Sequence, residues 1–125
     1  KDRHLKIANS KIHLDDGALK NGARPSISVS FNSLSSKYRN NFIAVLTCGY
    51  AADGVDSLAH LKRNNSVVIV QNPDDCEANS MPKEAKNRNI YDFVFDTENI
   101  AFYLSCMSLQ FVTIDEWIKY LLDGM

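Results

Sequence analysis

Two uninterrupted apolar runs, residues 42–47 (F-I-A-V-L-T) and 67–70 (V-V-I-V), constrain the fold of this chain more than any other feature. Both runs are rich in good strand formers, and neither alternates apolar with polar side chains. A strand without that alternation is buried on both faces, as in a parallel sheet covered by helices. The stretch from 48 to 66 is long enough for the crossover that two parallel strands require.

Helical patterns surround these runs. A helix is predicted after Ser26, with an apolar face that includes Phe31 and Tyr38, and further helices are predicted around residues 55–62, from Met81–Pro82 onward, and over 97–106. A third, short strand is predicted at residues 93–95. The alternation of strands and helices predicts an α/β fold, namely a parallel, doubly wound (Rossmann-like) sheet with helices on both faces.

The two ends of the chain carry their own patterns. Residues 5–7 and 12–14 alternate apolar and polar side chains around Asn9–Ser10, which predicts a short antiparallel β-hairpin ahead of the sheet. Residues 113–116 (T-I-D-E) form a capping box, and an apolar stripe follows, which predicts a last helix packed on the parent domain.

Composition narrows the class of protein. The 125 residues are 45% hydrophobic and 23% charged, which suits one soluble domain with one core. The net charge of −1 argues against nucleic-acid binding. No apolar run reaches the ~18 residues of a membrane span, so no membrane insertion is expected. The start of the chain lacks both a signal-peptide pattern and an initiator methionine, which fits a piece of a longer protein.

The three cysteines, Cys48, Cys76 and Cys106, are widely spaced and include no C-x-x-C pair. Neither a zinc site nor a disulfide framework is therefore predicted, and reduced thiols in a cytoplasmic protein are the simplest interpretation. No metal or other cofactor is predicted.

Loops beyond the carboxyl ends of parallel strands are where sites form in such sheets. In the first of these loops, Gly49 and Gly54 permit a tight backbone path, whose N–H groups could face an oxyanion, and Asp53 could orient a histidine. On the residues alone, an Asp-Gly pair after a strand is more often a turn or a helix cap.

Four sequence elements favour a functional role for Asp53 over a turn or a helix cap. Residues 46–58 resemble the L-T-G-M-G-x-D-G-x-x-G-L signature of the chemotaxis protein-glutamate methylesterase family, and residues 24–33 match its R-P-S-[IV]-D-x-x-F-x-S element. Gln71 precedes Met81–Pro82 at the separation of the Q-D-E-A-x-S-x-x-x-G-M-P element, with Cys76 where a serine is usual. Residues 90–95 resemble the G-A-V-D-x-V-L-P strand. On this resemblance, residues 1–104 are the C-terminal part of a methylesterase domain, and 105–125 are a C-terminal helical extension.

The resemblance implies hydrolysis of glutamate methyl esters on chemoreceptors by a Ser-His-Asp triad, with release of methanol. Asp53 then corresponds to the triad aspartate, and a backbone N–H of Gly49 or Tyr50 to an oxyanion donor. The implied partners are the methylated cytoplasmic helices of the receptor and, in a full-length response regulator, an N-terminal receiver domain with its histidine kinase.

This chain departs from the family pattern in several places. Five residues rather than four separate Thr47 from Asp53, while Ser28 and Ser80 replace an aspartate and a glycine. The family's serine and histidine lie upstream of the matched region, so this chain alone is expected to be inactive.

Local residues are weak substitutes for the missing pair. His4 and His13 are expected at the surface or edge of the hairpin, and His60 in solvent. Cys48 is expected to be buried and inert. Three serines also lack a nucleophile elbow, namely Ser26, Ser33 and Ser57.

Two alternatives stay open. One is a non-catalytic relative that keeps the fold for docking or regulation. The other, less favoured, is a receiver-like signalling domain, in which Asp74–Asp75 after the second run would hold Mg²⁺.

Overall fold

The expected fold class is confirmed. A computed structural model describes residues 1–35, 42–108, 118–119 and 122–123. Within them, β3 (Ile43–Leu46), β4 (Val67–Gln71) and β5 (Phe93–Phe95) form a parallel sheet in the order β3-β4-β5, with Leu46 opposite Val70 and Gln71 opposite Phe95. All three carboxyl ends therefore lie at one edge of the sheet.

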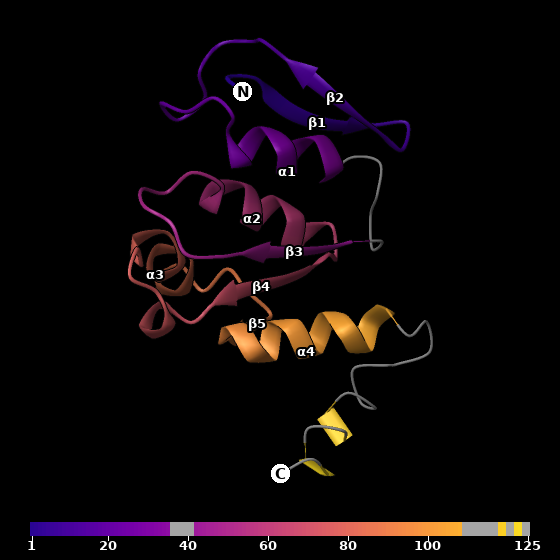
Figure 1. The fold of residues 1–125 in the computed structure, drawn as a ribbon, viewed down its shortest axis with the longest axis vertical. Coiled ribbons are helices and arrows are strands. Elements are labelled where there is room, and N and C mark those ends of the chain that lie inside the picture. The colour runs from indigo at the N-terminus through magenta and orange to yellow at the C-terminus, as the bar shows by residue number, and fades with distance from the viewer. Residues whose placement is uncertain (36–41, 109–117, 120–121, 124–125) are drawn as a thin grey trace.

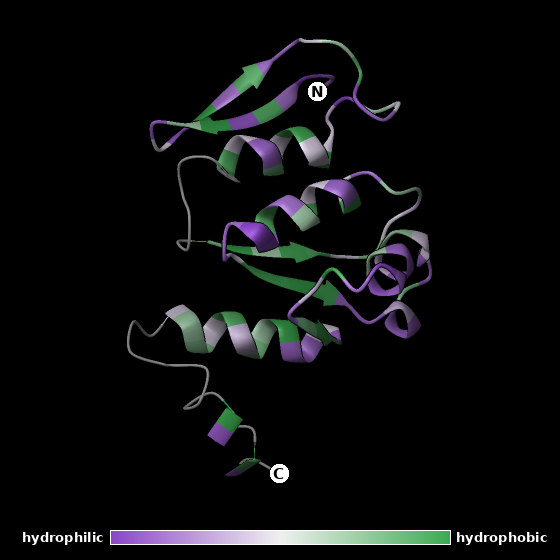
Figure 2. Cartoon of the chain, turned by 180° about the vertical axis from the view of Figure 1, so that it is seen from behind, coloured by the Kyte–Doolittle hydropathy of each residue, from purple (hydrophilic) through white to green (hydrophobic). Residues whose placement is uncertain are grey.

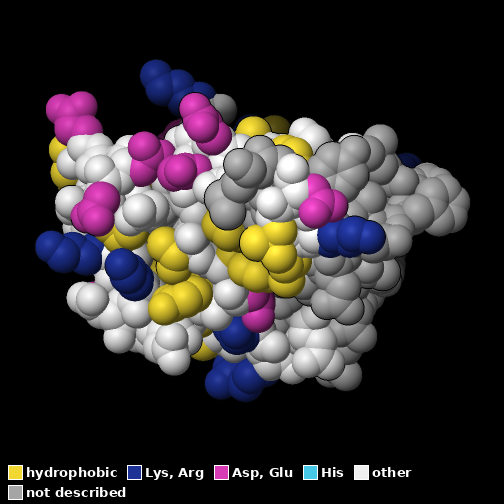
Figure 3. Space-filling model, turned by 90° about the horizontal axis from the view of Figure 1, so that it is seen from below, with side chains coloured by type: hydrophobic (Ala, Val, Ile, Leu, Met, Phe, Trp, Pro, Cys, Tyr) yellow, Lys and Arg dark blue, Asp and Glu magenta, His cyan; other side chains and the backbone are white. Residues whose placement is uncertain are grey.

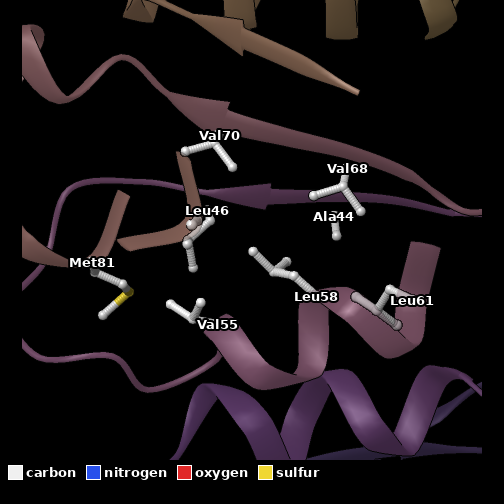
Figure 4. Close-up of a cluster of buried hydrophobic side chains, with 9 residues drawn as sticks. Ala44, Leu46, Val55, Leu58, Leu61, Val68, Val70 and Met81 are labelled. Carbon is white, nitrogen blue, oxygen red and sulfur yellow. The ribbon is translucent and has the colours of Figure 1, made fainter. Parts of the chain in front are cut away.

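Strand β4 lies at the centre, and its unbroken apolar sequence reflects burial on both faces. Val68 and Val70 pack with residues of α2 (Val55–Arg63) and α3 (Ser80–Asn87) on one face, as Figure 4 shows. Ile69 points to the other face, where α4 (Thr97–Ser108) covers it. Figure 2 shows β3 and β4 as the most uniformly hydrophobic elements, between helices of mixed hydropathy. The sheet thus has a helical layer on each side, as the sequence predicted.

The predicted hairpin is also present. Strand β1 (His4–Ala8) pairs antiparallel with β2 (Lys11–Asp15), and α1 (Ile27–Ser35) lies between this hairpin and α2 (Figure 1). A hydrogen bond joins α1 to β1, in which Ser33 Oγ accepts from the amide of Ile7 at 2.9 Å. This stacking brings the start of α1 beside the loop that precedes α2.

Several details differ from the expectations. His4 is only 2% exposed rather than at the surface, because its ring fits beneath the segment between the hairpin and α1. The turn after β4 is a short 3₁₀ helix, η1 (Pro73–Asp75), and α4 continues to Ser108. Tyr38 and most of the predicted last helix lie outside the described residues.

The surface shows mixed chemistry. Figure 3 shows exposed hydrophobic side chains on the lower face, with lysine, arginine and acidic side chains around them. Across the part of the chain that the structure describes, no helix is both long and apolar enough to cross a membrane.

Candidate functional site

The loop after β3, residues 47–54, meets the start of α1 through the carboxylate of Asp53. The Oδ1 atom accepts a hydrogen bond from Ser26 Oγ at 2.8 Å, and Oδ2 accepts one from the amide of Ile27 at 2.6 Å. The amide of Ser28 and the side chain of Asn21 lie at 3.4 Å from Oδ1. Asp53 therefore caps the first turn of α1, which is a different helix from the one that follows it in sequence.

These contacts keep the carboxylate ionised. Partial burial acts to raise the pKa of Asp53, but the hydrogen bonds from Ser26, Ile27, Asn21 and Ser28 outweigh it and lower the pKa below its usual value. A carboxylate with two oxygens offers about four acceptor positions, and Oδ2 uses one for Ile27. An ionised, half-exposed carboxylate of this kind is suited to accept an N–H from an imidazole.

Glycine at position 54 is required by its position between the loop and α1. Its φ is +89°, and a Cβ at this position would lie 2.6 Å from Cγ2 of Ile27. The Gly54 amide donates to Ser28 Oγ at 2.9 Å, so the loop and helix are joined in both directions. Ser28 thus serves as an acceptor where the family motif has an aspartate.

Behind this contact lies a buried histidine. The amide of Ser26 lies 3.2 Å from Nδ1 of His4, and Nε2 of the same ring lies 2.8 Å from the carbonyl oxygen of Ala18. Because an amide can only donate, Nδ1 is the acceptor and the ring proton is on Nε2. His4 thus supports Ser26, which in turn contacts Asp53. His13 and His60 are exposed, as expected.

The two predicted oxyanion donors, Gly49 and Tyr50, have different surroundings. The amide of Gly49 donates to the carbonyl of Ala78 at 2.8 Å, so it is occupied in this conformation. Tyr50 is 74% exposed at the tip of the loop. Of the two, Tyr50 remains the candidate donor.

The reduced-thiol expectation is wrong for two of the three cysteines. Cys48 and Cys76 are joined in a disulfide, with Cα atoms 5.4 Å apart, and only Cys106 is free and buried. Cys48 is exposed rather than buried. Their separation of 28 positions in sequence hid this contact, because it includes the whole crossover that returns the chain to the same edge of the sheet.

A polar network at this edge also escaped sequence reasoning. Gln71 Oε1 accepts from the amide of Cys48 at 3.0 Å, while its Nε2 donates to Thr97 Oγ1 at 3.0 Å and to Asp75 Oδ2 at 3.1 Å. Gln71 thereby ties the ends of β3 and β4 to the start of α4. Its position at the end of a buried strand was the available signal.

Among the described residues, no group of three or more His, Cys, Asp or Glu side chains could hold a metal ion. Asp75, one of the two carboxylates that would hold Mg²⁺ in a receiver-like domain, accepts hydrogen bonds from the hydroxyl and the amide of Thr97.

A pocket lies beside the Asp53 loop, between α1 and the end of β3. Its lining includes Ile27, Phe31, Thr47, Cys48 and Met81. Apolar side chains of α1, β3 and α3 thus line this pocket beside the loop.

The chain is similar in sequence to known proteins. The family model for CheB methylesterase matches residues 1–104. A protein-glutamate methylesterase/protein-glutamine glutaminase of Methanosarcina mazei is 31% identical over 108 residues, which cover 80% of this chain and 29% of that protein. A putative enzyme of the same name from Leptospira interrogans is 34% identical over 99 residues, which cover 78% of this chain and 51% of that protein.

The fold agrees with these sequences. The crystal structure of the Thermotoga maritima CheB methylesterase catalytic domain superposes with a TM-score of 0.73 and 26% identity, covering 79% of this chain and 55% of that one. This chain spans about half or less of the relatives named here. The match of sequence and fold over residues 1–104 shows that the chain belongs to the CheB methylesterase family.

Proposed function

We propose that this chain is the C-terminal portion of a chemotaxis protein-glutamate methylesterase and supplies the aspartate of its catalytic triad. The supporting observation is the position of Asp53, whose carboxylate is fixed by Ser26 and Ile27 at the carboxyl edge of the parallel sheet. In this fold class, that edge is where ligands bind.

The role of Asp53 follows from its hydrogen bonds. The side chain stays ionised and its orientation is fixed, so it can accept the N–H of a histidine and hold the imidazole in one tautomer. When the imidazole takes a proton from serine, the negative charge of Asp53 stabilises the imidazolium. The serine oxygen attacks the ester carbonyl, and the protonated histidine donates its proton to the departing methoxide oxygen, which leaves as methanol. Water, activated by the same histidine, then hydrolyses the acyl-serine and releases the glutamate carboxylate.

The serine and histidine are proposed to come from the upstream half of the domain. The serines of this chain near the site have structural contacts, since Ser26 Oγ donates to Asp53 and Ser57 Oγ donates to the carbonyl of Ser28 at 3.4 Å. His4 is held between Ala18 and Ser26. We therefore propose that this chain alone is inactive and that it completes a site built from both halves.

The substrate is proposed to be a glutamate methyl ester on a cytoplasmic chemoreceptor helix. The names of the relatives pair this activity with protein-glutamine glutaminase. Hydrolysis of a glutamine side chain uses the same attack and oxyanion, and releases ammonia instead of methanol, so one site accommodates both reactions. A cytoplasmic location and control by a phosphorylated receiver domain belong to the same proposal.

The test uses the full-length protein with its upstream half. Methanol release from methylated chemoreceptor would be measured for the wild type, Asp53→Asn and Asp56→Asn. Asp56 is the matched control, because it lies three residues along the chain and its side chain is 74% exposed. We expect Asp53→Asn to lower kcat about 10⁴-fold, as loss of a triad aspartate does, and Asp56→Asn to leave it within about twofold.

Two results would contradict the proposal. A folded full-length protein that releases neither methanol nor ammonia would support the docking or regulatory alternative. An active protein whose kcat is unchanged by Asp53→Asn would leave Asp53 with only its helix-capping role.

A further inference from the structure

We propose that Cys48 and Cys76 form a thiol–disulfide exchange site that reacts with small-molecule disulfides and dithiols. Their sulfur atoms are bonded and their Cα atoms lie 5.4 Å apart, within the usual range for a disulfide. Cys48 is exposed and Cys76 half-buried, whereas Cys106 is buried. An incoming thiol or disulfide can therefore reach this pair.

Contacts other than the S–S bond bring the two cysteines together. Cys48 lies just beyond the end of β3, and its amide donates to the side chain of Gln71 on β4 at 3.0 Å. The turn η1 reverses the chain after β4, and the amide of Cys76 donates to the carbonyl of Pro73 at 3.1 Å. Because these hydrogen bonds make the approach, the two thiols remain close when the disulfide is open, which favours its re-formation.

The pair is a property of this chain rather than of the family motifs. Cys48 stands where the L-T-G-M-G signature has a glycine, and Cys76 stands where a serine is usual. Both substitutions fall at the same edge of the sheet and meet across adjacent strands. Because the two substituted residues, Cys48 and Cys76, bond to each other, we infer that they function as a pair.

The exchange is balanced without another reactant. In the oxidising direction, a Cys48 thiolate attacks a disulfide RSSR, forms a mixed disulfide and releases one RS⁻. A Cys76 thiolate then attacks the Cys48 sulfur and releases the second RS⁻. The protein thiols lose two electrons and two protons, and RSSR gains them as two RSH. A dithiol reverses both steps.

The bond restrains the loop that carries Asp53. Cys48 begins residues 48–54, and the next residue, Gly49, exchanges hydrogen bonds with Ala78 and Met81 at 2.8 and 3.1 Å. The disulfide therefore reinforces the contact between this loop and the start of α3, and opening it frees the loop from its covalent link. The consequence for catalysis rests on the proposed function, but the exchange site does not.

The experiment counts thiols on the full-length protein after incubation with oxidised glutathione or with dithiothreitol, followed by alkylation, proteolysis and mass spectrometry. In the oxidised sample we expect the Cys48 and Cys76 peptides to be linked and only the Cys106 peptide, among these three, to be alkylated. In the reduced sample all three are alkylated. Hydrogen exchange at the amides of Gly49 and Met81 should be faster in the reduced sample.

Variants separate the pair from general effects. Cys76→Ser introduces the residue that is usual in the family, so it is expected to fold, to abolish the linked peptide and to make hydrogen exchange insensitive to dithiothreitol. Cys106→Ser is the matched control and should keep the link and the redox response.

Alkylation of all three cysteines after oxidised glutathione would overturn the proposal. A linked peptide that dithiothreitol reduces would support the exchange site, but if its reduction leaves hydrogen exchange at Gly49 and Met81 unchanged, the inference that the bond restrains the loop is overturned. Neither readout needs ester hydrolysis, so an inactive enzyme would not affect the result.

Discussion

Ser26 Oγ donates to Oδ1 of Asp53 at 2.8 Å, although the two residues are 27 positions apart in sequence. Ser26 is itself 1% exposed and its amide donates to His4. The position of the candidate catalytic carboxylate thus depends on the R-P-S element that leads into α1 as much as on its own loop. That dependence can be measured directly.

Ser26→Ala should raise the pKa of Asp53, because it removes one of the hydrogen bonds that lower it. It should also reduce the free energy of unfolding by about 1 kcal/mol, the usual net contribution of such a bond. NMR titration of the Asp53 carboxyl and urea denaturation would measure both effects. Ser105→Ala is the control, since Ser105 is exposed and its hydroxyl donates within its own helix, to the carbonyl of Ala101, so it should change neither.

The pH dependence of stability should carry the signature of Asp53. Its folded-state pKa is lowered, so its contribution to stability is fully present above the unfolded-state value of about 3.9 and is lost as the pH falls through the lower folded-state value. Asp53→Asn should therefore cost stability at neutral pH and progressively less in acid. Urea midpoints from pH 7 to pH 3 would test this. A constant difference between variant and wild type across that range would contradict the assignment.

Sequence reasoning was strongest where a pattern repeats along one element. The unbroken runs at 42–47 and 67–70 predicted buried parallel strands, since burial on both faces of a sheet removes the need for polar residues. The alternation at residues 5–7 and 12–14 likewise predicted the hairpin. Local patterns of this kind depend on near neighbours only.

Contacts between residues far apart in the chain could not be predicted from the sequence. The burial of His4 and the Cys48–Cys76 bond depend on which loops the crossovers bring together, and one chain carries no local signal for that. For Asp53, the sequence indicated the kind of contact but not the helix that it joins. An Asp-Gly pair suggested a helix cap, and the structure shows a cap on α1, a helix that precedes Asp53 in sequence and that local reasoning did not connect to it.

Gly54→Ala should be clearly destabilising. The residue has φ +89°, and the added methyl group would also lie 2.6 Å from Ile27 Cγ2. A positive φ of this kind disfavours any side chain. Gly22→Ala is a matched control, because Gly22 has φ +74° but no atom within 4 Å of the place that a Cβ would take. We expect a loss of about 1 kcal/mol for Gly22→Ala from backbone conformation alone, and at least about 1 kcal/mol more for Gly54→Ala from overpacking. Equal losses in thermal or urea denaturation would show that the α1 contact is not tight.

Gln71→Glu should destabilise the protein through the polar network at the sheet edge, by an amount that depends on pH. The Gln71 amide donates to Asp75 Oδ2, and hydrogen bonds from Thr97 and Gln71 lower the pKa of that carboxyl, so Asp75 is ionised at neutral pH. The substitution removes a donor and places a second carboxylate against the first, at a residue that is only 7% exposed. Both burial and the neighbouring charge disfavour that second carboxylate.

We therefore expect Gln71→Glu to cost about 1–3 kcal/mol at pH 7, and less near pH 5, where the introduced carboxyl, its pKa raised by burial and by Asp75, becomes protonated and can donate again. Urea denaturation at the two pH values tests this. Asn72→Asp is the control, because Asn72 Oδ1 already acts as an acceptor, for the amide of Asp74, and a carboxylate can replace it. A Gln71→Glu penalty that is the same at both pH values would mean that lost packing, rather than the carboxylate pair, causes it.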